Sequence, residues 1–85
     1  MDERARHDRT LRLLEARLEA LAGACERDPR GELRLEREIV AAIAATRHAV
    51  ALELITPREA EGIWATVARR HPGSAWCRTG PRVAA

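Results

Sequence analysis

The side chains best suited to binding in this sequence are Glu15, Arg47, His48 and Trp64. If the chain reverses between helices near residue 30, Arg47 lies level with about residue 13, within a turn of Glu15. A second reversal near residue 56 would place Trp64 level with His48. The simplest interpretation is an ion pair covered by an indole. The alternatives are a ligand pocket or a partner-binding hot spot, where Trp and Arg are enriched, and a catalytic site.

A second candidate set is basic and lies near the C-terminal end. Residues 56–85 hold five arginines against two acidic residues. Phosphate contacts, with an indole stacking on a base, would use Arg69, Arg70, His71, Trp76, Arg78 and Arg82. The alternative is a solvated helix end, where cations complement the helix dipole. Pro72 and a tail follow, so no helix-turn-helix is predicted.

Metal binding and catalysis have little support in the sequence. Zinc-type ligands occur at Cys25, His48, His71 and Cys77, but no paired spacing such as C-x-x-C is present. We therefore predict neither a metal site nor a cofactor. Phosphate loops and nucleophile elbows are also missing, so the sequence favours a protein that is not an enzyme without deciding the point.

One family resemblance concerns the all-helical chorismate mutases. Arg37-Glu38 and the stretch from Thr56 to Val67 are similar to the second half of that family. The first predicted helix lacks the family's Ile-Asp repeat, and the chain contains no lysine for the active site. No residue role is carried over, and a small-molecule-binding helical enzyme remains an alternative function.

Composition predicts the fold class. With 85 residues, no Phe, no Tyr and two Trp, the core must consist largely of Leu, Ile, Val and Ala, and Ala and Leu are the best helix formers. We expect an all-α protein with one domain over residues 1–72. Charged residues follow Met1 and no long apolar run occurs, so we expect no membrane segment, a cytoplasmic location and reduced cysteines.

Local signals predict three helices, over about residues 3–27, 32–55 and 56–71. Leucines spaced three and four apart form a seam along the first helix. Asp28-Pro29-Arg30-Gly31 predicts a reversal that makes a long antiparallel hairpin. Thr56-Pro57-Arg58-Glu59 predicts a capping box at the third, shorter helix. Residues 73–85 are expected to form a loosely docked tail.

The second predicted helix is apolar around most of its circumference and should be the most buried element. A hairpin and a short third helix cannot cover it, so we expect a dimeric helical bundle, with a thin-cored monomer as the alternative. The leading hypothesis is a homodimeric interaction or regulatory module that binds a protein partner through Trp64, Arg47 and the basic end. The second hypothesis is a nucleic-acid-associated regulator that uses the Arg-rich C-terminal third.

Overall fold

The computed structural model describes residues 2–28, 30–78 and 80–81, and this part of the chain forms helices and turns without a β-strand. The prediction of an all-α protein is confirmed. The helices are α1 (Glu3–Arg27), α2 (Gly31–Arg34), α3 (Glu36–Ala51), α4 (Pro57–Arg70) and α5 (Ala75–Arg78). Pro29 and Arg82 lie outside the described residues, as do the end of the predicted tail and the side chain of Arg78.

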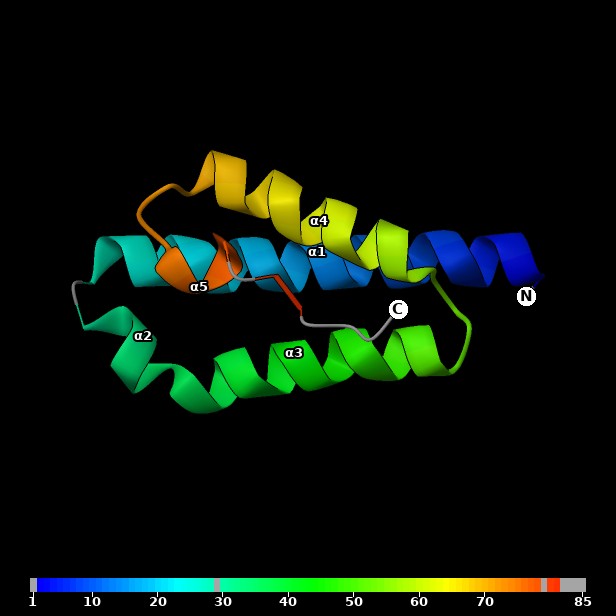
Figure 1. Ribbon diagram of the computed structural model, residues 1–85, viewed down its shortest axis with the longest axis horizontal. Helices are drawn as coiled ribbons and strands as arrows, with labels where there is room; N and C mark the ends of the chain where they lie inside the picture. Colours follow the sequence, from blue (N-terminus) through cyan, green and yellow to red (C-terminus); the bar gives the residue numbers. More distant parts are fainter. Residues whose placement is uncertain (1, 29, 79, 82–85) are drawn as a thin grey trace.

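Helix α1 is the element against which α3 and α4 both pack (Figure 1). The chain runs along α1, returns along α2 and α3, and crosses back over α1 as α4. The Asp2 side chain caps α1 by accepting a hydrogen bond from the backbone N–H of Ala5 at 2.7 Å. Leu14, Leu18 and Cys25 are buried, so the leucine seam faces the core. None of the helices in the described chain is long and apolar enough to cross a membrane.

The helix expected over residues 32–55 is divided and ends early. Leu35 separates α2 from α3 with φ −101° and ψ 17°. Hydrogen bonding continues past this residue, because its N–H bonds to Gly31 O at 2.8 Å. Helix α3 ends at Ala51, where Glu53 takes a left-handed φ of 60°. The N–H of Leu54 then bonds to Ala49 O at 2.9 Å, which closes a Schellman motif. The sequence has no Gly at the left-handed position, so the usual signal for this helix end is missing.

Helix α4 begins as predicted. The backbone N–H of Glu59 donates to Thr56 Oγ1 at 3.1 Å, and the backbone N–H of Thr56 donates to Glu59 Oε1 at 2.9 Å. Pro57 occupies the first helical position. The capping box is confirmed, and the helix ends at Arg70, just before His71 and Pro72.

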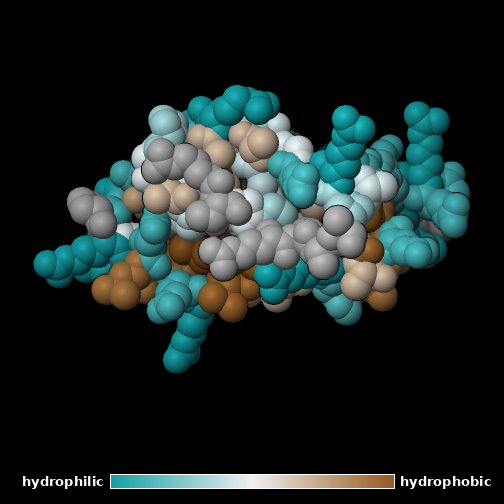
Figure 2. All heavy atoms as spheres, in the orientation of Figure 1, coloured by the Kyte–Doolittle hydropathy of each residue, from teal (hydrophilic) through white to brown (hydrophobic). Residues whose placement is uncertain are grey.

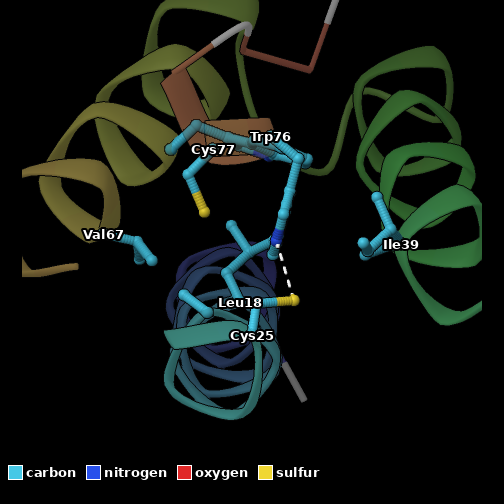
Figure 3. Close-up of a cluster of buried hydrophobic side chains, with 9 residues drawn as sticks. Leu18, Cys25, Ile39, Val67, Trp76 and Cys77 are labelled. Carbon is cyan, nitrogen blue, oxygen red and sulfur yellow. Dashed lines mark hydrogen bonds between the residues drawn. The ribbon is translucent and has the colours of Figure 1, made fainter. Parts of the chain in front are cut away.

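Two indoles, those of Trp64 and Trp76, belong to a core cluster otherwise made of small and aliphatic side chains. Figure 3 shows the Trp76 indole nitrogen directed at Cys25. Trp64 is 1% exposed, and its ring meets that of Trp76 edge to face, with centroids 5.2 Å apart. Trp64 Nε1 donates to Thr46 Oγ1 at 3.2 Å, and Trp76 Nε1 donates to Cys25 Sγ at 3.3 Å. A loosely docked tail is predicted from residue 73, whereas the structure places Trp76 and Cys77 in the core.

Candidate interaction surface

The ends of α4 are joined to α1 by histidines that each lie between two carboxylates. His71 Nε2 lies 2.6 Å from Glu19 Oε2, and its Nδ1 lies 2.5 Å from Glu26 Oε1. At the other end, His7 Nε2 lies 2.5 Å from Glu59 Oε2, and its Nδ1 lies 3.0 Å from Asp8 Oδ1. A neutral imidazole has only one N–H, so it would leave one carboxylate facing a lone pair. Both sites therefore favour the imidazolium form.

The electrostatics of these bridges agree with their geometry. Hydrogen bonds to Glu19 and Glu26 raise the pKa of His71, and those to Asp8 and Glu59 raise the pKa of His7. Hydrogen bonds from Arg70 and then His71 lower the pKa of Glu19. In these bridges, charged side chains that are exposed or half-exposed give up part of their hydration. In return they make contacts that fix α4 on α1.

Acidic side chains also hold the segment that follows α4. The backbone N–H of Gly73 donates to Glu26 Oε2 at 3.1 Å, and that of Ala75 donates to Glu32 Oε1 at 3.0 Å. These bonds position α5 so that Trp76 enters the core. The spacing of Glu19 and Glu26, seven residues apart on one face of α1, is a partial clue. Nothing local connects them with His71, which lies 52 and 45 positions later.

The four residues predicted to share a layer have different neighbours in the structure. Glu15 pairs with Arg70 across 3.4 Å rather than with Arg47. Arg47 is exposed, and its Nε donates to the carbonyl oxygen of Pro81 at 3.3 Å. His48 is also exposed, while Trp64 is buried. The structure therefore supplies two accessible candidates for binding, both of them on α3.

The predicted phosphate-contact residues are partly engaged with other groups. Arg70 NH1 lies 2.7 Å from Glu19 Oε1, and His71 is held by two carboxylates. Trp76 is 8% exposed, so its indole is not presented for base stacking. Arg69 is exposed and donates to Thr66 Oγ1 at 3.2 Å. The roles predicted for the Arg78 side chain and for Arg82 fall outside the described part of the chain.

The side chains that could bind a metal or act as nucleophiles are buried or are not grouped together. Among the residues that the structure describes, no group of three or more His, Cys, Asp or Glu could hold a metal ion. Cys25 and Cys77 are both buried free thiols. Burial raises the pKa of the Cys77 thiol to about 11, so it stays protonated at neutral pH and is a poor nucleophile.

The most distinctive accessible feature is apolar and lies on α3, on the side turned away from the core. Val40 is 58% exposed, and Ala44 and Ala51 are exposed on the same side of the helix. Leu33 before α3 and Leu52 after it are 75% and 56% exposed. We call Val40, Ala44 and Ala51 the outer stripe. Figure 2 shows hydrophobic surface, interrupted by hydrophilic side chains, along the edge that α2 and α3 form.

Charged side chains flank the outer stripe on both sides. Glu36 and Arg47 are eleven residues apart, which places them about 20° apart around the helix axis. Arg37 and His48 have the same spacing on the other flank, and all four are exposed. The outer face of α3 thus has an apolar middle. One of its flanks carries an acid, Glu36, near the start of the helix and a base, Arg47, near the end. The apolar pattern predicts that this helix is the most buried element, but the structure leaves Val40, Ala44 and Ala51 exposed.

Comparisons with protein-family models, with curated proteins and with solved structures found no match to this chain.

Proposed function

We propose that this chain is a small helical interaction module that forms a homodimer through the outer stripe of α3 and presents the assembled surface to a protein partner. The observation that carries this proposal is the exposure of Val40 on α3, together with Leu33 on α2 and Leu52 just after α3. Exposed apolar side chains gathered on adjoining segments in this way are typical of protein contact sites.

The free energy of burying apolar side chains favours a second copy of this chain as the molecule that binds the outer stripe. Fully burying a Val or Leu side chain is worth about 1.5–3 kcal/mol, and a two-fold contact buries each participating residue twice. A standard interface takes about 800 Å² from each partner, which is about one seventh of the 5824 Å² surface of this chain. A face centred on α3 with Leu33 and Leu52 at its ends suits a contact of this kind.

The choice of α3 over other apolar surface rests on its surroundings. Leu13 on α1 is 60% exposed, but it lies in a shallow hollow lined by Ala5, Arg9 and Arg12. Two copies meeting there would bring like charges together. On α3, the flank of Glu36 and Arg47 has both signs.

The proposed partner surface differs from the one inferred from the sequence. Trp64 is buried in the core, whereas Arg47 and His48 are exposed beside the outer stripe, where they would contact the second copy. Two free thiols, Cys25 and Cys77, are consistent with a reducing compartment, and we propose a cytoplasmic location.

Light scattering coupled to gel filtration at micromolar concentration tests the dimer. We expect a two-chain mass for the wild type and a one-chain mass for Val40→Glu, because the substitution introduces two facing carboxylates into the apolar middle. Leu13→Glu is the matched control, since Leu13 has nearly the same exposure, and should keep the two-chain mass. Circular dichroism checks that each variant stays helical. A one-chain mass for the wild type would overturn the proposal.

A further inference from the structure

The order of charges along α3 makes its outer face self-complementary. Glu36 lies near the start of the helix and Arg47 near its end, on the same flank of the outer stripe, with Val40 between them. Eleven residues of α-helix span about 16 Å, which is too far for the two side chains to pair within one copy.

Two helices related by a two-fold axis between them run antiparallel when the axis is perpendicular to both. Such an axis keeps each flank on its own side and reverses the order of the residues along it. If the axis passes between Ala41 and Ala42, Glu36 of one copy lies level with Arg47 of the other, and the pair occurs twice. A parallel arrangement would instead exchange the flanks, so that Glu36 would lie beside Arg37 of the other copy and Arg47 beside His48, without an acidic partner.

We infer that two copies of this chain pack α3 against α3 in antiparallel orientation, with Glu36 of each copy paired with Arg47 of the other. This inference rests on the proposed function and adds the orientation and register of the contact. In this register Val40 meets Ile43 and Ala44 of the second copy, so a branched side chain packs beside a small one. Arg37 and His48 meet on the opposite flank, which therefore contributes no attraction between opposite charges.

The hydrogen bond that Arg47 makes within its own chain is compatible with the pairing. Its Nε donates to Pro81 O at 3.3 Å, and a guanidinium has five N–H donors. One bond from Nε therefore does not exhaust the group. It also orders the side chain, which lowers the entropy cost of a second contact.

Charge reversal tests the register directly. Each of the variants Glu36→Arg and Arg47→Glu should weaken the dimer by about tenfold or more, because two attractive pairs become two repulsive pairs. The double variant Glu36→Arg/Arg47→Glu should restore affinity to within about threefold of wild type, since opposite charges face each other again. Sedimentation equilibrium at low salt, where exposed charges are least screened, measures the constants.

Mixing the two single variants provides a sharper test. One copy then carries Arg at positions 36 and 47 and the other carries Glu at both, so both pairs of a mixed dimer are attractive. Each variant alone should be mostly monomeric, and an equimolar mixture should give the two-chain mass. Glu38→Arg changes the net charge as Glu36→Arg does, on an exposed position of α3 away from the outer stripe, and should leave the wild-type dimer intact.

The outcomes separate this inference from the proposed function. Suppose that the wild type is a dimer and that Val40→Glu disrupts it. The register alone is then overturned if the single charge reversals leave the dimer unchanged, or if neither the double variant nor the mixture restores the affinity that the single variants lose. A monomeric wild type overturns the dimer and the register together.

Discussion

Helix α4 packs on α1 through buried apolar side chains along its middle and through charged side chains at both ends. The outer face of α3 also has apolar side chains along its middle, but these stay exposed. On α4, Trp64 and Val67 are 1% and 0% exposed, and His7 and His71 bridge to the neighbouring helix. On α3, Val40 is 58% exposed. The single chain therefore buries the apolar side of α4 and leaves apolar side chains exposed on the outer side of α3.

The first way to test this contrast is to shorten one side chain on each side. Trp64→Ala should lower the free energy of unfolding by about 3–5 kcal/mol, because it leaves a cavity and leaves Thr46 without its indole donor. Val40→Ala should change the free energy of unfolding of the monomer by less than about 0.5 kcal/mol, since little contact is lost. Urea titration of both variants measures these changes, at a protein concentration below the dissociation constant of the proposed dimer so that the monomer is compared. Similar losses for both variants would show that α3 is as closely packed as α4.

The second test uses two glycines in opposite surroundings. A Cβ at Gly31 would lie 2.7 Å from the Cα of Cys25, where α2 approaches α1, whereas a Cβ at Gly62 on α4 would meet nothing within 4 Å. Gly31→Ala should therefore destabilise the fold by about 1–3 kcal/mol.

Gly62→Ala is the matched variant and should stabilise α4 by about 0.5–1 kcal/mol through helix propensity. Thermal unfolding followed by circular dichroism should show the two melting temperatures moving in opposite directions. A neutral effect at Gly31 would mean that the contact between α1 and α2 can open without cost.

The smallest expected effect concerns pH and the histidine bridges. Because the pKa of His71 is raised above 6.5, its bridge contributes fully below pH 6.5 and is lost as pH rises through the raised pKa. The pKa of Glu19 is lowered below 4.5, so its contribution is present above 4.5 and is lost as pH falls through the lowered pKa. Stability from this cluster should be greatest between these limits.

His71→Gln should flatten the alkaline side of the stability profile, measured as the urea midpoint from pH 5.5 to 9. His48→Gln is the control, because His48 is exposed on α3 and has no bridge to carboxylates in the described chain. If stability still falls at alkaline pH in His71→Gln, the fall arises from other groups. His7 would be the next group to test, because its pKa is also raised.

Signals that act within one or two turns were visible in the sequence. The capping box at Thr56 and Glu59 depends on residues three apart, and the leucine seam of α1 repeats along one helix. The candidate site was only partly accessible to such reasoning. Helix lengths predict that Arg47 and His48 lie level with Glu15 and Trp64. In the structure Arg47 and His48 are exposed on α3, and the neighbours of Glu15 and Trp64 are Arg70 and Thr46.

Local signals are enough to predict that the chain is helical and where α1 and α4 begin, because capping and helix propensity act between near neighbours. Tertiary structure decided the break at Leu35, the left-handed turn at Glu53 and the burial of Trp76. It also decided which side of α3 remains exposed. The burial of Trp76 depends on a contact between residues far apart in the chain, since its indole bonds to Cys25, 51 residues earlier. No local pattern contains that information, because the energy of a contact becomes available only after the helices have packed.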